Sequence, residues 1–277
     1  MNVLIPTDFS DNAWNAVAYA LSLLEEVSVS FHLLHVRTAP AIESGPEIQG
    51  NGVVLSPARK INANSELKQL VARVERNFPN QRHRFETHVE HGFFIKEMRQ
   101  QVAQLDIDLI IMGTKGASGI KKYTLGSNAG DVITKVKCPV LVIPERAKYE
   151  TPRHIAFPTD FNLLYKNRIL KTLGKISKLH HSQLHVVHVT NAPAQMTDAQ
   201  RRNKAFLVDS LSSIQHSFYN CTAQDLEEAI QRFVEKNQIN MIAMVAKNLN
   251  FFQRILFRPT VRNMSYHTEV PFLVLHE

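Results

Sequence analysis

The sequence predicts an α/β protein made of two tandem, doubly wound, five-stranded parallel sheets. Three observations predict this fold class: apolar strand patterns alternate with helical patterns, the short strands are continuously apolar, and one series of motifs occurs twice. Continuously apolar strands are typical of a parallel sheet that helices cover on both faces. Alternating strands and helices then wind into such a sheet through right-handed crossovers.

The first half supplies the elements in order. We expect a strand at 3–5, a helix that begins after a Ser10 cap and runs to residue 25, and a second strand at 27–36. Residues 38–57, rich in glycine, proline and polar residues, predict a long loop. The remaining elements are expected as helix 58–78, strand 84–89, helix 94–105, strand 109–112, helix 127–136 and strand 140–143.

The second half repeats the landmarks of the first. Pro-Thr-Asp-Phe follows an apolar strand at 6–9 and again at 158–161. A second apolar strand ends in His-Val at 33–36 and again at 186–189, and a proline precedes the last apolar strand at 139–143 and again at 271–275. An internal repeat of this length indicates a duplicated domain. We therefore expect domains at 1–147 and 152–277, joined by a short polar linker that contains proline.

Composition excludes several classes of protein. The 277 residues are 44% hydrophobic and carry a net charge of +7, but the basic residues are scattered doublets, so we expect no nucleic-acid binding. Cys138 and Cys221 cannot form a disulfide framework, and neither belongs to a recognisable nucleophilic site. No basic, apolar leader and no run of about 18 apolar residues occurs, so we expect a cytoplasmic protein without a membrane span.

The segment after the fourth predicted strand carries the most chemistry. It reads Gly113-x2-Gly116-x9-Gly126-Ser127, and it lies between a strand and a helix. Glycines allow the backbone to adopt positive φ and to approach a sugar or phosphate closely. A helix that begins at Gly126 and Ser127 presents free N–H groups to an anion, and Lys115 adds positive charge. Taken alone, however, three glycines also fit an ordinary turn.

Asp8 directly follows the first strand. In an open α/β sheet, ligands bind at the carboxyl ends of strands where the strand order reverses. A carboxylate there can accept ribose hydroxyls or help to hold Mg²⁺ on a phosphate, with Val36 and Met112 as walls for a base. The alternative is structural, because Pro-Thr-Asp is also a common turn in which the aspartate caps a helix.

Together these motifs resemble the universal stress protein family in its tandem two-domain form, over nearly the whole chain. The resemblance implies a Rossmann-like fold of the adenine nucleotide alpha hydrolase type, with strand order 3-2-1-4-5 in each half. It also implies that the protein binds ATP. The backbone of Val36 would contact the base, the glycine segment would contact the ribose and phosphates, and Mg²⁺ would lie near Asp8. Asn128 departs mildly from the pattern, which usually has a small apolar residue there. The implied contacts are Pro6, Thr7, Asp8, Val36, Met112, Gly113, Lys115, Gly116, Gly126, Ser127 and Asn128.

The second half lacks this segment. A constant offset of 132 places Val245, Asn248, Arg258 and Pro259 where Gly113, Gly116, Gly126 and Ser127 stand in the first half. We therefore expect nucleotide binding in the first half only, with Asp160 as a turn or helix cap. The apolar residues 251–257 fit either a segment that fills the crevice or a surface for a partner.

Histidines offer no clear metal site in the sequence. His185 and His188 are three apart on one predicted strand and point to opposite faces, while His83, His88 and His91 lie near another strand. We therefore expect at most the Mg²⁺ that accompanies ATP.

Three functions remain open. The first is an ATP-binding module for stress response or signalling, whose nucleotide changes a surface read by an unknown protein partner. The second is a slow ATPase or phosphotransferase, for which no residue is evidently poised to activate water. The third is a nucleotide-free scaffold, in which the two domains pair through the edges of their last strands and two chains can pair further.

Overall fold

The structure is a computed structural model, and it describes residues 1–37, 62–114, 127–190, 196–223, 226–246 and 269–276. The first half consists of β1 (Asn2–Pro6), α1 (Asp11–Leu23), β2 (Val29–Arg37), α2 (Ala63–Asn77), β3 (His83–His91), α3 (Phe94–Gln104), β4 (Leu109–Gly113), α4 (Ser127–Lys135) and β5 (Val140–Ile143). The second consists of β6 (His154–Thr159), α5 (Asn167–Leu179), β7 (Gln183–Thr190), α6 (Asp198–Ser210), β8 (His216–Thr222), α7 (Leu226–Lys236), β9 (Met241–Val245) and β10 (Phe272–Leu275).

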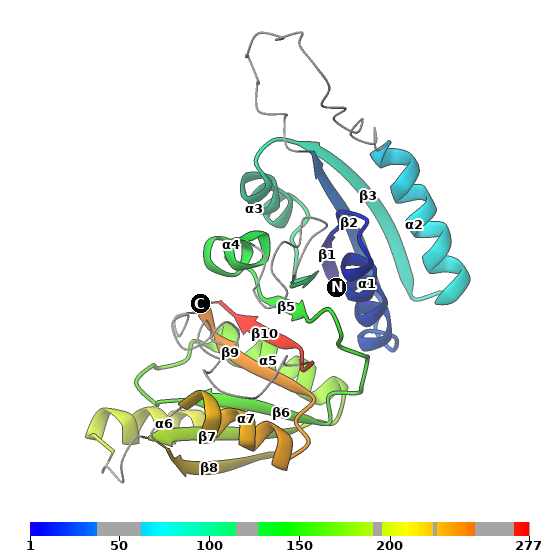
Figure 1. The fold of residues 1–277 in the computed structure, drawn as a ribbon. Coiled ribbons are helices and arrows are strands. Elements are labelled where there is room, and N and C mark those ends of the chain that lie inside the picture. Colours follow the sequence, from blue (N-terminus) through cyan, green and yellow to red (C-terminus); the bar gives the residue numbers. More distant parts are fainter. Residues whose placement is uncertain (38–61, 115–126, 191–195, 224–225, 247–268, 277) are drawn as a thin grey trace, which may run out of the picture.

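The strands form one ten-stranded sheet in the order β3-β2-β1-β4-β5-β10-β9-β6-β7-β8. Each half therefore has the strand order 3-2-1-4-5, and all neighbours within a half are parallel. The α/β class and the strand order expected for each half are confirmed. The two halves lie one below the other in Figure 1, with β5 and β10 between them.

Local sequence explains where the helices begin. The Ser10 side chain accepts a hydrogen bond from the Ala13 backbone amide at 3.2 Å, so Ser10 caps α1 as predicted. Asn62 caps α2 in the same way, through the Ser65 amide at 3.4 Å. The helix expected from residue 58 thus begins at Ala63, and residues 38–61, with the expected loop, lie outside the described residues.

Two apolar layers cover the sheet, one on each face. In the first half, α1 and α2 pack on one face and α3 and α4 on the other, as Figure 1 shows. Both layers continue into the second half, where α5 and α6 share the layer of α1, and α7 shares the layer of α3. Each layer is therefore one hydrophobic core that both halves contribute to.

The halves meet where β5 pairs with β10 in antiparallel register, with Leu141 opposite Leu273. This is the pairing through last-strand edges that the repeat suggested, here between two halves of one chain. Both leucines are fully buried in the layer that contains α1 and α5. Pairing the two edges leaves neither strand open to other chains.

Two remaining expectations concern cysteine and membranes. Cys138 is fully buried, its Sγ lies 3.5 Å from the Ile107 carbonyl oxygen, and burial raises the pKa of the thiol to about 12. Such a thiol stays protonated and is a poor nucleophile. Among the described residues, no helix is both long and apolar enough to cross a bilayer.

The shared core predicts that damage in the second half destabilises the first. Leu273→Ala should lower the free energy of unfolding by about 2–5 kcal/mol, because it leaves a cavity at the junction of the two sheets. Trp14, the only tryptophan in the chain, lies on α1 in the first half and reports unfolding there by fluorescence.

We expect the denaturation midpoint followed by Trp14 fluorescence to fall together with that followed by far-ultraviolet circular dichroism. Leu164→Ala, at a side chain that is 58% exposed, is the control and should leave both midpoints unchanged. A Trp14 midpoint that stays in place while the dichroism midpoint falls would show that the two halves unfold independently.

Candidate functional site

The candidate site lies where β1 and β4 separate. β1 pairs with β2 along all five of its residues, but it pairs with β4 only at Val3 and Leu4. β4 continues past this point beside β5 as far as Gly113. Since β1 and β4 are the strands between which the chain order reverses, their carboxyl ends diverge at the switch point of the sheet.

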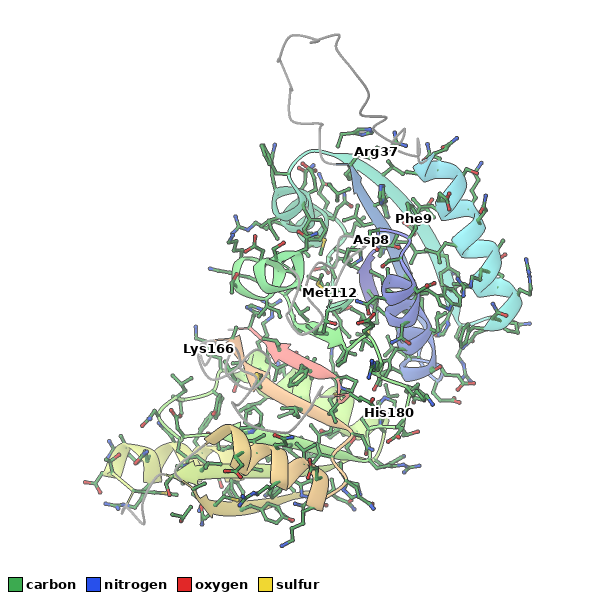
Figure 2. All side chains as sticks on the ribbon, in the orientation of Figure 1. Asp8, Phe9, Arg37, Met112, Lys166 and His180 are labelled. Atoms are coloured by element: carbon green, nitrogen blue, oxygen red, sulfur yellow. The ribbon has the colours of Figure 1, made fainter. Side chains whose placement is uncertain are left out.

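A cavity of about 110 Å³ lies at this divergence. Figure 2 labels two residues of its wall, Asp8 after β1 and Met112 on β4. Polar groups and apolar side chains share the wall, which is typical of a small-molecule site. The lining residues are Pro6, Thr7, Asp8, Ala13, His35, Val36, Phe94, Met112, Gly113, Thr114, Asn128 and Ala129.

The structure brings together most of the residues singled out from the sequence. Seven of the eleven line the cavity: Pro6, Thr7, Asp8, Val36, Met112, Gly113 and Asn128. Ser127 is exposed at the first residue of α4, next to the lining residue Asn128. Lys115, Gly116 and Gly126 lie outside the described residues.

Asp8 has a structural role in addition to its place in the wall. Its Oδ1 accepts hydrogen bonds from the Ser10 amide at 3.1 Å and from the Ser10 hydroxyl at 2.6 Å. These bonds hold Ser10 in position to cap α1. The turn interpretation of Pro-Thr-Asp is therefore correct for one carboxylate oxygen, and it fixes the direction of the carboxylate at the cavity.

A second element of the wall is a turn fastened to β2. Phe9 has φ = +65°, a region that bulky residues rarely adopt, and its ring stacks on His35 with centroids 4.7 Å apart. The Nδ1 atom of His35 lies 2.8 Å from the Thr7 carbonyl oxygen, in hydrogen-bond contact. Because such backbone strain persists only where its surroundings enforce it, the stacking and the hydrogen bond together fix Thr7 and Asp8 beside the end of β2.

The packing around Gly113 requires a glycine for a reason that the sequence did not predict. Its φ lies outside the positive range, so the expected use of left-handed backbone at this position is wrong. A Cβ atom at Gly113 would lie 2.9 Å from the Cγ atom of Asn12, a buried residue of α1. Glycine here lets α1 pack closely over the end of β4.

α4 places its amino end at the cavity. The helix runs for nine residues from Ser127, and its second and third residues, Asn128 and Ala129, line the cavity. The first amides of a helix have no intrahelical partner and lie at the positive end of the helix dipole. A negatively charged group in this cavity would therefore be stabilised at its α4 side.

Five lining residues were not predicted from the sequence. His35 had a signal, because a His-Val pair ends the second strand in both halves. Ala13, Phe94 and Ala129 occupy positions in three helices that helical periodicity assigns to the core, and nothing in the pattern separates cavity from core. Thr114 directly follows Gly113 and could have been included with it.

The second half has the same framework with different contents. β6 pairs with β9 only at Ile155 and Ala156, Phe161 has φ = +57°, and His188 Nδ1 lies 3.0 Å from the Thr159 carbonyl oxygen. These features match those of the first half one by one. The rings of Phe161 and His188 also lie in contact, with centroids 4.8 Å apart, as those of Phe9 and His35 do. The turn, the ring contact and the strand divergence are therefore properties of the repeated fold rather than of one site.

Two side chains distinguish the equivalent place in the second half. The Tyr165 hydroxyl lies 2.6 Å from Oγ1 of Thr159, the counterpart of the lining residue Thr7. Tyr165 is buried, and burial raises the pKa of its hydroxyl to about 12. Val245 pairs with Leu275 as Gly113 pairs with Ile143, so a buried valine stands in the place of the glycine. Asn248, Arg258, Pro259 and the apolar residues 251–257 lie outside the described residues.

The packing of Asn12 on Gly113 can be measured. Gly113→Ala should destabilise the protein by about 1–3 kcal/mol, because the new methyl group overlaps the amide of Asn12. Combining it with Asn12→Ala should recover part of that loss, which chemical denaturation of the two single variants and the double variant would show as a favourable coupling energy. Strictly additive effects would mean that the two residues do not crowd each other.

Comparison with known proteins places this architecture in a family. A sequence model described as the universal stress protein family matches residues 1–144. A universal stress protein of Methanocaldococcus jannaschii is 29% identical over 53% of this chain and 83% of its own length. A universal stress protein of Synechocystis is 25% identical over 98% of both chains.

Solved structures show the same fold over the full length. The crystal structure of a universal stress protein from Archaeoglobus fulgidus covers 99% of this chain and 98% of its own, with a TM-score of 0.62 and 18% identity. A putative universal stress protein from Pseudomonas aeruginosa covers 99% and 92%, with a TM-score of 0.59 and 14% identity. The family match over more than half of the chain and the repeated fold lead to one conclusion: this chain belongs to the universal stress protein family.

Proposed function

We propose that the first half binds one ATP, together with Mg²⁺, in the cavity between the ends of β1 and β4. The proposal depends on one observation. Residues that the sequence predicts to contact a nucleotide come from separate segments of the chain and line one cavity. These segments are 6–8, residue 36, 112–113 and residue 128. A cavity that combines a carboxylate with a helix N-terminus suits a ligand with a sugar at one end and phosphates at the other.

Each part of the wall fits one part of the nucleotide. Val36, near the end of β2, offers its backbone and an apolar surface to the base, and Met112 faces the same cavity. Asp8 serves the ribose hydroxyls or a Mg²⁺ ion bound to the phosphates. The amides at Ser127 and Asn128 serve the phosphates, and by position Gly126 does so as well, with Lys115 adding positive charge. Gly113 and Gly116 are assigned to the ribose.

In this proposal the second half, 152–277, is a scaffold for the first, 1–147. Tyr165 and Val245 occupy the region where a nucleotide would contact Thr159 and β9. Pairing of β10 with β5 keeps the carboxyl end of the first sheet in one arrangement. The chain then acts in the cytoplasm as a nucleotide-dependent module of stress response or signalling, with a protein partner that reads the liganded state.

The proposal is tested by calorimetric titration with ATP and Mg²⁺, which should give one site per chain. Asp8→Ala should weaken binding by about tenfold or more, because a hydrogen-bonded or metal-bridging carboxylate is lost. Asp160→Ala is the matched control. Asp160 holds its own turn through hydrogen bonds at 2.9 Å to the Asn162 amide and to the Asn162 side chain, much as Asp8 holds Ser10.

Both variants thus lose a turn, but only Asp8→Ala should lose ATP affinity. Equal affinities in the two variants would remove Asp8 from the binding site. Two equivalent ATP sites per chain would contradict binding in the first half alone. Phosphate release above background that Asp8→Ala abolishes would instead favour the enzymatic alternative.

A further inference from the structure

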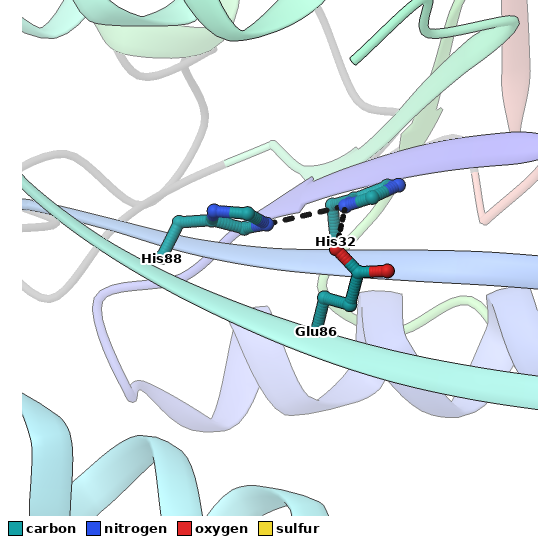
Figure 3. Close-up of side chains that lie close together, drawn as sticks. All are labelled: His32, Glu86 and His88. Atoms are coloured by element: carbon teal, nitrogen blue, oxygen red, sulfur yellow. Dashed lines mark hydrogen bonds and ion pairs between the residues drawn. The ribbon is translucent and has the colours of Figure 1, made fainter.

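A cluster of three potential metal ligands lies on the first sheet, away from the residues that line the cavity. His32 is on β2, and Glu86 and His88 are on the neighbouring strand β3. One ligand atom from each residue lies within 4.8 Å of the other two, and Figure 3 shows the three side chains turned toward each other. We propose that His32, Glu86 and His88 bind a Zn²⁺ ion.

The spacing of the ligand atoms fits a tetrahedral ion. Zinc binds imidazole nitrogens and carboxylate oxygens at about 2.0–2.2 Å, so neighbouring ligand atoms on a tetrahedron are about 3.3–3.5 Å apart. His32 Nδ1 lies 3.1 Å from His88 Nε2 and 3.5 Å from Glu86 Oε2. The ligand atoms of Glu86 and His88 lie within 4.8 Å of each other. An ion between the three groups therefore needs these two exposed or half-buried side chains to approach each other by up to about 1.5 Å, which their rotatable bonds allow.

The chemistry of the three groups selects the metal. The Nδ1 atom of His32 faces a ring nitrogen and a carboxylate oxygen, and a single proton on Nδ1 can be donated fully to only one of them. A divalent cation satisfies all three groups at once. Two imidazoles and one carboxylate suit zinc, whereas Mg²⁺ and Ca²⁺ prefer oxygen ligands throughout.

The sheet holds the ligands in place before any ion arrives. In the parallel register of β2 and β3, His32 lies opposite Glu86 and Leu34 lies opposite His88. Alternate residues of a strand share a face, so both β3 ligands project to the side of His32. The His32 side chain is only 5% exposed while Glu86 is 58% exposed, so the site has a buried base and an open side for an ion and a fourth, water ligand.

The repeated half offers an internal comparison. His185 is the counterpart of His32, because it lies three residues before His188 as His32 lies three residues before His35. His185 lies opposite Ser217 and near Tyr219 on β8. Its Nε2 lies 3.2 Å from His154 Nδ1. No carboxylate accompanies this histidine pair at the position that corresponds to Glu86, so we expect zinc in the first half only and one ion per chain.

One feature limits the affinity. Binding through Nδ1 leaves the ring proton of His32 on Nε2, and this atom is buried and has no hydrogen-bond partner among the described residues. A buried donor without a partner weakens binding by about 10- to 100-fold. We therefore expect a dissociation constant in the micromolar range rather than the tighter binding of a closed structural zinc site.

The test is a zinc titration of the full-length, tag-free protein in a buffer without ATP and Mg²⁺. The expected result is one zinc ion per chain, with binding weakened by at least about tenfold in both Glu86→Gln and His88→Gln. His91→Gln is the control, because it removes an exposed histidine of the same strand and should change nothing. Co²⁺ in place of zinc should give visible absorption bands of a tetrahedral site, which both ligand variants lose.

Circular dichroism of each variant checks that the fold is retained. The proposal is overturned if the two ligand variants bind zinc as tightly as the unchanged protein, or if the unchanged protein binds none at about 100 μM zinc, far above the expected dissociation constant. Because no nucleotide is present, either outcome leaves the assignment of the ATP cavity unaffected.

Discussion

The short pairing between β1 and β4 determines where the first sheet opens. The two strands are hydrogen-bonded neighbours at Val3 and Leu4 and then separate, although both continue toward their carboxyl ends. The separation occurs where the strand order reverses, and it opens the sheet to a ligand without disturbing the buried strands. The strained turn at Phe9, its contact with His35 and the close packing of Asn12 on Gly113 all hold the two sides of this opening in place.

The repeat shows which features belong to the fold and which to the site. Both halves keep the divergent strands, the aromatic residue at positive φ and the histidine that contacts the turn. Among the described residues, side chains at the opening differ, since Tyr165 meets Thr159 and Val245 stands in the position of Gly113. In the proposed function, duplication lets the first half bind the ligand, while the second half completes the sheet through β10 and shares both hydrophobic layers.

The sequence was sufficient for most of the fold because its strands are continuously apolar, as at 140–143, and because the first helix has a clear cap at Ser10. The reason for Gly113 could not be predicted, because it lies in a contact with Asn12, about 100 positions away in the chain. The histidine cluster was missed for a similar reason. His83 and His91 project from one face of β3, and His88 projects from the other. On that second face, the register with β2 brings His88 to His32, and this neighbour cannot be read from the strand alone.

In the proposed function, the opening between β1 and β4 holds an adenine nucleotide in the first half alone. A crystal structure of the protein grown with ATP and Mg²⁺ tests it most directly. The account predicts one nucleotide per chain, with its base beside Val36, its ribose or metal ion at Asp8 and its phosphates at the amino end of α4. Density for a nucleotide beside Tyr165 in the second half, or an empty first cavity at saturating ATP, would contradict it.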